Sequence, residues 1–140
     1  MEVIINRCHG GFGLSLKAQK RYCELKGNEV YFYKQTKYKW RDGKNEYQKV
    51  EDCNDSSFVY AVTKDYGKTM SDFPDGGNYF SDRDIPRDDP DLIKVVKELA
   101  GEASGDCANL AVVEIPDGTE WVIEEYDGFE WVAEKHRTWS

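Results

Sequence analysis

The amino-acid sequence predicts one α+β domain, built from a mainly antiparallel sheet of about six to seven strands and two helices. The chain has 140 residues, the length of one ordinary domain, so residues 1–140 are treated as a single domain. Two segments carry helix caps and apolar residues at helical spacing. The other apolar residues fall mostly in short stretches between turn signals, which is typical of strands.

The first part of the chain predicts a strand, a glycine-rich turn and a helix. Glu2–Asn6 is a short apolar stretch that predicts a largely buried strand. The glycines within residues 10–13 follow, and they permit backbone conformations that are closed to other residues. Ser15 is a suitable N-cap for a helix over Lys17–Lys26, and Gly27 suits the position just past its end.

The middle of the chain has the composition of strands and hairpins. Strands are expected over Asn28–Gln35, Tyr47–Val50 and Ser57–Thr63, where aromatic and β-branched residues gather. The pair at residues 42–43, an aspartate and a glycine, is a strong hairpin signal. Lys64–Asp89 is expected to be irregular, and a loop of that length is usually functional or folded by its own side chains.

A second helix and the last strands are expected in the C-terminal part. Asp89 is a suitable N-cap, and Pro90 suits the first helical position. The apolar stripe of this helix consists of Leu92, Val95, Val96 and Leu99. Three strands should follow, over Leu110–Ile115, Trp121–Glu125 and Glu130–Glu134, with turns at 116–118 and 126–128.

The composition is that of an acidic protein, with a formal net charge of -8 and a pI near 4.8. Long nucleic acid is bound largely by neutralising its phosphates, so we expect no long nucleic acid among the partners. A small anionic ligand stays compatible with this charge, because a few local arginines can outweigh a distant acidic surface.

Targeting and metal signals are not found in the sequence. No basic stretch followed by an apolar one opens the chain, so no signal peptide is expected, and the apolar runs are far shorter than the ~20 residues that cross a bilayer. The four cysteines are scattered and the two histidines stand near opposite ends. We therefore expect no membrane, metal or cofactor, and a reduced protein in the cytoplasm.

The segment from Tyr79 to Pro90 is the most informative candidate for a binding site. Phe80 precedes Arg83 and Arg87, which flank a turn stiffened by proline. Arginine forks onto phosphate and an aromatic ring stacks on a base, so the segment predicts a site for a phosphate-bearing nucleotide. The alternative is that both arginines pair with neighbouring aspartates and make the loop rigid.

Two further segments are candidates for ligand binding. Phe12 lies in the glycine turn before a helix N-terminus, where free N–H groups attract anions, although a plain tight turn with a packed phenylalanine explains the same residues. The C-terminal end gathers aromatic and basic side chains, namely Trp131, His136, Arg137 and Trp139. We expect this end to pack, either on its own core or on a second subunit.

No pattern in the sequence favours catalysis. No Ser, Cys or Thr stands in a nucleophile signature, and no pair of histidines indicates a metal site. The many carboxylates lack a distinctive spacing. We therefore expect a binding protein and not an enzyme.

Several segments resemble a family of small phage proteins. They are Ile4–Asn6 with Gly10–Ser15, Tyr79–Phe80 with Arg83–Pro90, Val113–Pro116, Glu125–Gly128 and Glu130–Trp139. The family includes the first Thoeris anti-defence proteins, which are cytosolic sponges that sequester immune signals. The resemblance runs nearly from end to end of the chain.

This resemblance implies a specific function. Such sponges bind, without cleaving them, the cyclic ADP-ribose isomers that bacterial TIR-domain enzymes make on sensing a phage. They assemble as dimers or higher oligomers, hexamers among them, and some members also capture cyclic oligonucleotides at separate sites. The implied ligand is therefore a small cyclic nucleotide, the implied partner a second copy, and the implied location the cytosol of a bacterial host.

Two other functions stay open. An acidic protein can mimic nucleic acid and act as an anti-CRISPR-like inhibitor that binds a bacterial defence nuclease, and the net charge of -8 permits this. An enzyme that degrades the same signals is the third possibility, and the absence of a metal or nucleophile motif counts against it.

Overall fold

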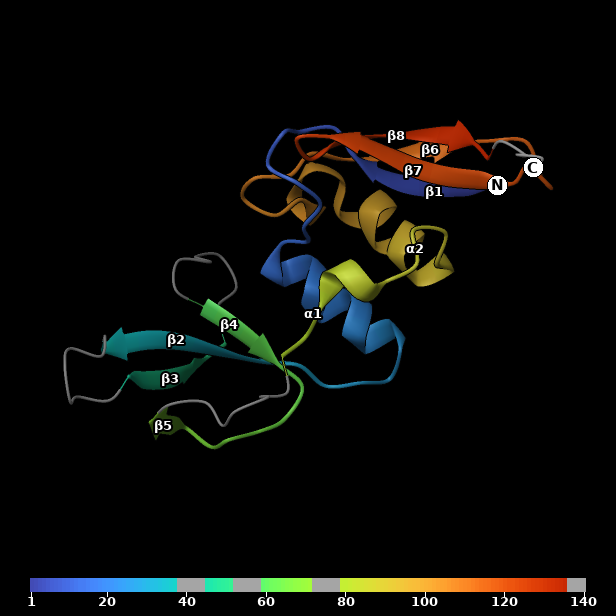
Figure 1. Cartoon of the computed structure of the whole chain (residues 1–140). Coiled ribbons are helices and arrows are strands. Elements are labelled where there is room, and N and C mark those ends of the chain that lie inside the picture. Colours follow the sequence, from blue (N-terminus) through green and yellow to red (C-terminus); the bar gives the residue numbers. More distant parts are fainter. Residues whose placement is uncertain (38–44, 52–58, 72–78, 136–140) are drawn as a thin grey trace, which may run out of the picture.

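The computed structural model describes residues 1–37, 45–51, 59–71 and 79–135. Within them it contains two α-helices, two short 3-10 helices and eight strands (Figure 1). The strands are β1 (Glu2–Asn6), β2 (Tyr31–Lys37), β3 (Glu46–Val50), β4 (Val59–Val62), β5 (Thr69–Ser71), β6 (Leu110–Glu114), β7 (Trp121–Tyr126) and β8 (Phe129–Glu134). The helices are α1 (Leu16–Leu25), η1 (Asp82–Asp84), α2 (Pro90–Leu99) and η2 (Ala100–Ala103).

Both α-helices begin at the caps that the sequence predicts. The hydroxyl of Ser15 accepts a hydrogen bond from the N–H of Ala18 at 3.1 Å, and α1 lies one residue earlier than expected. Asp89 accepts a hydrogen bond from the N–H of Asp91 at 2.8 Å. Pro90 occupies the first position of α2, where its missing N–H removes no helical hydrogen bond.

One half of the molecule is built in layers (Figure 1). β1 pairs with β6 in antiparallel orientation along its whole length. Figure 1 shows the hairpin of β7 and β8 over this pair, with α2 and then α1 on the opposite side. Because both faces of β1 are covered, Val3, Ile4 and Ile5 are all buried, as the sequence predicts for the first strand.

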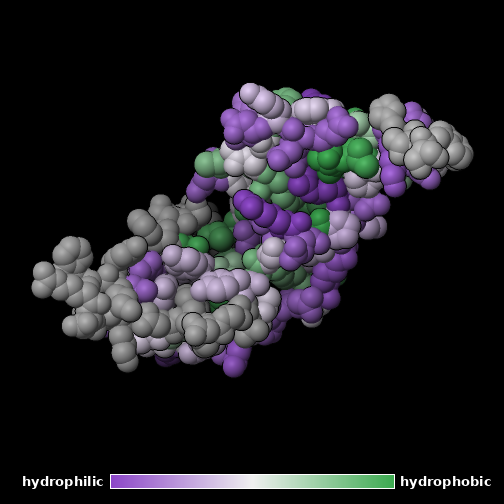
Figure 2. All heavy atoms as spheres, viewed as in Figure 1, coloured by the Kyte–Doolittle hydropathy of each residue, from purple (hydrophilic) through white to green (hydrophobic). Residues whose placement is uncertain are grey.

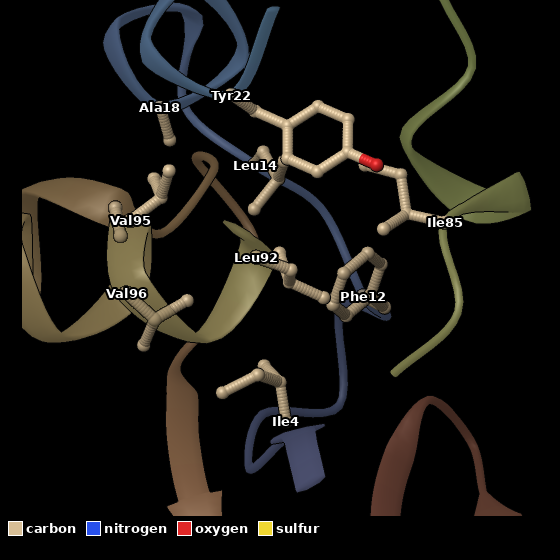
Figure 3. Packing of buried hydrophobic residues seen from close by; sticks show 10 residues of the cluster. Ile4, Phe12, Leu14, Ala18, Tyr22, Ile85, Leu92, Val95 and Val96 are labelled. Carbon is tan, nitrogen blue, oxygen red and sulfur yellow. The ribbon is translucent and has the colours of Figure 1, made fainter. Parts of the chain in front are cut away.

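The main hydrophobic core lies between the two helices, β1 and the turn before α2. Figure 3 shows Leu92, Val95 and Val96 of α2 turned toward side chains from the N-terminal part of the chain. Its buried members are Ile4, Phe12, Leu14, Ala18, Tyr22, Ile85, Leu92, Val95, Val96 and Ala103. Each large apolar side chain buried here stabilises the fold by about 1.5–3 kcal/mol, so this cluster holds the layers together.

The second sheet has the strand order β4-β2-β3-β5 and is also antiparallel. Figure 1 shows it beyond α1, on the side away from β1. It has a small buried cluster of its own, formed by Tyr33, Tyr47 and Val62. The hydroxyl of Tyr33 donates to the carbonyl of Gly67 at 2.7 Å and accepts from the N–H of Tyr66 at 2.9 Å. The polar end of this fully buried ring is therefore satisfied.

The observed fold class is the predicted one, a single α+β domain with antiparallel sheets and two α-helices. The eight strands slightly exceed the expected number, and they are divided among three sheets. The unexpected strand is β5, which lies inside the segment that the sequence predicts to be irregular. The hairpin expected at residues 42–43 lies outside the described residues.

The surface on the face shown in Figure 2 is largely hydrophilic over the part that contains the helices. This agrees with the excess of charged residues in the sequence. None of the described helices is long and apolar enough to cross a membrane.

Candidate functional site

The turn that precedes α2 is fixed to the core on both sides. At its start, Asp82 accepts a hydrogen bond from the N–H of Leu14 at 2.8 Å. In its middle, Ile85 is 7% exposed and belongs to the core. At its end, Asp89 caps α2 and accepts a hydrogen bond from the hydroxyl of Tyr22 at 2.8 Å. The segment that the sequence singles out is therefore held in place by several separate contacts.

Arg83 and Phe80 lie in or beside this turn with different surroundings. Arg83 is exposed on η1, and in the part of the chain that the structure describes its guanidinium has no hydrogen bond or ion pair. Phe80 is half-buried against the core, with its ring 6.3 Å from the ring of Tyr22. Its neighbour Tyr79 is 50% exposed. A cation and aromatic rings thus lie on one fixed segment.

Arg87 is placed differently from Arg83. Its guanidinium makes a two-pronged contact with Glu130, at 2.6 and 2.9 Å, and one nitrogen also donates to the carbonyl of Ile4 at 3.3 Å. Its central carbon lies 3.7 Å from the ring centre of Phe12. The sequence offered neighbouring aspartates as partners for Arg87, and the carboxylate that binds it belongs instead to β8.

Phe12 belongs to the main core and is 8% exposed. One face of its ring is covered by the guanidinium of Arg87. Of the two interpretations of Phe12, the geometry favours a packed phenylalanine in a tight turn. The predicted site residues Phe12 and Arg87 come together, but in a buried cluster in which their binding groups are already occupied.

Two residues that the sequence analysis did not select, Glu130 and Asn6, complete this buried cluster. Glu130 accepts a hydrogen bond from the N–H of Asn6 at 2.8 Å. The side-chain amide of Asn6 donates to the carbonyls of Cys8 and Gly128, at 2.7 and 2.8 Å. The alternation of residues along β8 could have predicted the position of Glu130. Phe129 and Trp131 lie on one face of the strand, so the residue between them must lie on the other face.

Gly10 and Gly128 permit a close approach of three chain segments. A Cβ on Gly10 would lie 2.0 Å from the carbonyl oxygen of Cys107. Gly128, at the tip of the β7–β8 hairpin, has a φ of +85°, and a Cβ there would lie 2.5 Å from the nitrogen of Gly11. With Asp127 also at positive φ (50°), this tip is a two-residue turn of the kind that suits twisted hairpins. Close packing therefore accounts for Gly10 and Gly128, whereas a φ of +90° accounts for Gly11.

The C-terminal hairpin carries three exposed aromatic side chains. Tyr126, Phe129 and Trp131 are 74%, 36% and 41% exposed. The ring nitrogen of Trp131 donates to Glu124 on the facing strand at 3.1 Å. Trp131 thus lies on the outer face of β8, opposite to the face from which Glu130 reaches Arg87. The other C-terminal candidates, His136, Arg137 and Trp139, lie outside the described residues.

A hydrogen-bonded network connects α1 to the start of α2. The amine of Lys26 lies 3.1 Å from Asp89 and 2.9 Å from Asp91. Burial and the bond to Asp89 raise the pKa of Tyr22 to about 12. Burial opposes the ionisation of Asp89, but hydrogen bonds from Tyr22, a backbone N–H and Lys26 outweigh it and lower the pKa of this carboxyl. The network holds the end of the turn in one arrangement.

The turn before α2 presents a cation and aromatic rings. Arg83 offers a forked donor for phosphate, and Phe80 and Tyr79 offer rings for a planar group. Among the residues that the structure describes, no group of three His, Cys, Asp or Glu side chains is placed to hold a metal ion.

Comparison with known proteins gave no match. No protein-family model fits the chain, and neither the curated proteins nor the solved structures contain a significant match to it. The function must therefore be argued from the chain itself.

Proposed function

We propose that this chain binds a small phosphate-bearing cyclic nucleotide, a cyclic ADP-ribose isomer, and sequesters it in the cytosol of a bacterial host without cleaving it. The observation that carries the proposal is Arg83, an exposed guanidinium without a partner in the described residues, held on a turn that is fixed to the core. Phe80 and Tyr79 supply aromatic surface on the same segment. The sequence resemblance to phage sponges supplies the class of ligand.

Sequestration sets a condition on affinity. A signal present at about micromolar concentration is removed only by a much tighter binder, so a nanomolar Kd, about -12 kcal/mol, is required. A small polar ligand reaches this value only when pre-organised groups enclose most of its surface. Arg83 is exposed in the single chain, so the proposal includes a dimer or larger oligomer in which a second copy closes the site.

The first test asks what the protein does to the ligand. The protein is incubated with a cyclic ADP-ribose isomer, separated from free ligand and denatured by heat, and the released material is analysed by mass spectrometry. We expect intact ligand in stoichiometric amount. Release of a product would assign an enzyme, and the absence of any retained ligand would contradict the proposal and is the result expected of a protein-binding inhibitor.

The second test asks whether Arg83 binds the phosphates. Arg83→Ala should weaken ligand binding by about 1.5–3 kcal/mol, roughly ten- to a hundred-fold in Kd, because a charge-assisted hydrogen bond is lost. The melting temperature should stay unchanged, since the guanidinium forms no hydrogen bond or ion pair within the described residues. Lys94→Ala, an exposed cation on α2, is the matched control. Equal affinities of the two variants would place the ligand elsewhere.

A further inference from the structure

The hydrogen bonds between β1 and β6 determine which backbone groups of β6 point away from β1. At one end of the pair, Met1 and Ile115 exchange two hydrogen bonds, at 3.0 and 2.8 Å. At the other end, the N–H of Arg7 donates to the carbonyl of Asn109 at 2.8 Å. Hydrogen-bonded and non-hydrogen-bonded positions alternate in an antiparallel pair, and the register between these ends is unbroken. Val112 lies midway between Asn109 and Ile115, at a non-hydrogen-bonded position, so its N–H and carbonyl point away from β1.

The outer edge of β6 is open over part of its length. Leu110 and Glu114 point their backbone groups outward as Val112 does, because they alternate with the residues that bond to β1. The hydroxyl of Ser104 accepts a hydrogen bond from the N–H of Leu110 at 2.9 Å. Among the residues that the structure describes, none bonds to the N–H or carbonyl of Val112 or Glu114, and β1 is the only strand that pairs with β6. Such an edge is a template for another strand.

Each of the other strand edges in the described residues carries some protection. The outer edge of β1 is closed, because Ile4 donates its N–H to the carbonyl of Arg87 at 2.9 Å and Asn6 donates its N–H to Glu130. In the second sheet, the N–H of Phe80 bonds to β4, and β5 has only three residues. The hairpin strands β7 and β8 each contain two glutamates, which discourage edge pairing. β6 differs from them, because its sequence is four apolar residues followed by one glutamate.

The charges beside this edge indicate which kind of strand fits it. Glu114 is exposed and lies opposite Glu2 across the β1–β6 pair, and like charges in directly opposed positions are destabilising. Lys97 neutralises Glu2 at 2.6 Å, whereas Glu114 has no ion pair within the described residues. A lysine or arginine on an added strand, opposite Glu114, supplies the missing cation. A second copy fits less well, because antiparallel pairing centred on Val112 places Leu110 opposite Glu114 and joins two chains of net charge -8.

We propose that β6 binds an extended segment of another protein by strand addition, and that this segment is apolar with a lysine or arginine opposite Glu114. An antiparallel segment centred on Val112 exchanges two backbone hydrogen bonds with Val112 and two with Glu114. The backbone bonds supply affinity, and the residues at alternate positions supply specificity. The edge of β6 is distinct from the turn that carries Arg83 and Phe80. The inference therefore goes beyond the proposed cyclic-nucleotide function and does not depend on it.

The first experiment measures amide hydrogen exchange by NMR on the whole protein, with and without a short synthetic peptide. The peptide carries lysine opposite Glu114, valines opposite Val112 and Leu110, threonines between them and a serine at each end. In the free protein, the amides of Ala111 and Val113 should be protected by β1, and those of Val112 and Glu114 should exchange faster. We expect the peptide, at concentrations up to about 1 mM, to protect Val112 and Glu114.

Two results of this experiment overturn the inference. One is the absence of binding at about 1 mM peptide. The other is protection of Val112 and Glu114 in the free protein, which would show that the edge is already paired. Protection that increases with protein concentration would identify a second copy as the occupant, and protection that does not would identify the chain itself.

Matched variants of the peptide test whether it pairs through its backbone. N-methylation of the valine opposite Val112 removes a donor that faces β6 and adds a methyl group that collides with the strand. Kd should rise by at least about tenfold. N-methylation of the next threonine alters an N–H that faces solvent, so Kd should stay nearly unchanged. Equal effects of the two methyl groups would overturn strand addition as the mode of binding.

Matched variants of the protein test the charge at the end of β6. Glu114→Lys should weaken binding of the lysine peptide by about two- to thirtyfold, and it should favour a peptide with glutamate in place of that lysine. Glu125→Lys, which reverses an exposed charge on the β7–β8 hairpin, is the control and should bind both peptides as the wild type does. Thermal melting confirms folding, and Glu114→Lys should fold well because it removes the like charge opposite Glu2. Equal effects of the two substitutions would overturn the inference.

Discussion

Arg87 connects three parts of the chain through one guanidinium. It binds Glu130 of β8, donates to the carbonyl of Ile4 in β1 and covers the ring of Phe12. The side chains of Arg87 and Glu130 are only 17% and 7% exposed. Because little water reaches these two charges, each charged group is stabilised mainly by the other. The pair therefore attaches the C-terminal hairpin to the core.

Glu130→Ala should lower the free energy of unfolding by about 3–5 kcal/mol, because it leaves a largely buried guanidinium uncompensated. It also removes the acceptor for the N–H of Asn6. Glu124→Ala is the control on the same hairpin, since Glu124 is exposed and should cost no more than about 1 kcal/mol. Chemical denaturation measures both. Equal losses in the two variants would show that the ion pair does not anchor the hairpin.

Substitutions of Phe80 test whether its ring binds a base or only packs in the core. It is half-buried, so Phe80→Ala should cost less stability than Phe12→Ala, for which about 3–5 kcal/mol is expected. If a purine stacks on Phe80, the alanine variant also loses about 1–3 kcal/mol of ligand affinity, whereas Phe80→Tyr keeps most of it. Melting temperature and ligand affinity are measured on each folded variant. Unchanged affinity in Phe80→Ala would make this ring a packing residue only.

At the scale of single residues, the sequence predicted types of contact better than partners. It offered an ion pair for Arg87 as one alternative, but with the adjacent aspartates. The observed partner is 43 residues away, and it meets Arg87 only because β8 returns to the side of β1. A pattern of neighbouring residues cannot predict a partner so far away in the sequence. The close approaches of Gly10 and Gly128 likewise depend on chain segments that meet only in the folded protein.

At the scale of elements, local signals were sufficient for the helices. Ser15, Asp89 and Pro90 set the starts of α1 and α2 through contacts within a few residues, which a sequence displays directly. β5 is the opposite case. It has only three residues and exists through its pairing with β3, so nothing in its own composition distinguishes it from a loop.

The cap of α2 makes stability depend on pH. The pKa of Asp89 is lowered in the folded protein, so this carboxylate contributes stability above its unfolded pKa of about 3.9 and loses it as the pH falls through the folded value. Asp89→Asn keeps an oxygen for the cap but loses the charge that faces Lys26 and Tyr22. We expect this variant to melt earlier than the wild type at pH 7.

The difference between the two melting temperatures should shrink as the pH is lowered from about 5 toward 3, since the wild type then becomes neutral at this position too. Measuring the difference cancels the other carboxyl groups with lowered pKa, such as Asp65 and Glu98. A gap that stays constant across this range would mean that the charge of Asp89 contributes nothing to the cap.

At the scale of the whole molecule, the sequence predicted strands but not how they are shared among sheets. Turn signals place neighbours in hairpins, as for β7 and β8, because the turn and both strands are contiguous. β1 pairs with β6, although more than a hundred residues of sequence separate the two strands. No turn signal predicts such a pairing. The second sheet is separate from the β1–β6 sheet because α1 and α2 pack against β1. This packing depends on several segments together, so no single segment predicts it.

The exposed aromatic face of the C-terminal hairpin predicts self-association. Tyr126, Phe129 and Trp131 combine large apolar area with polar edges, and such residues are enriched in the centres of interfaces. We expect light scattering to report a particle of at least twice the 16.2 kDa of one chain. Trp131→Glu should dissociate it, because a charge cannot be desolvated at an apolar contact, whereas Tyr79→Ala, outside the hairpin, should not.

Salt dependence identifies which surface makes this contact. A contact through the hairpin brings together two acidic chains of net charge -8, so added salt screens their repulsion and should strengthen the assembly. A contact between exposed lysines of the second sheet, such as Lys64 and Lys68, and the acidic part of another copy is attractive and should weaken with salt. Static light scattering at about 50 and 500 mM salt distinguishes the two signs. A 16.2 kDa particle at both concentrations would exclude an oligomer, and the proposed ligand site would then have to reach nanomolar affinity within one chain.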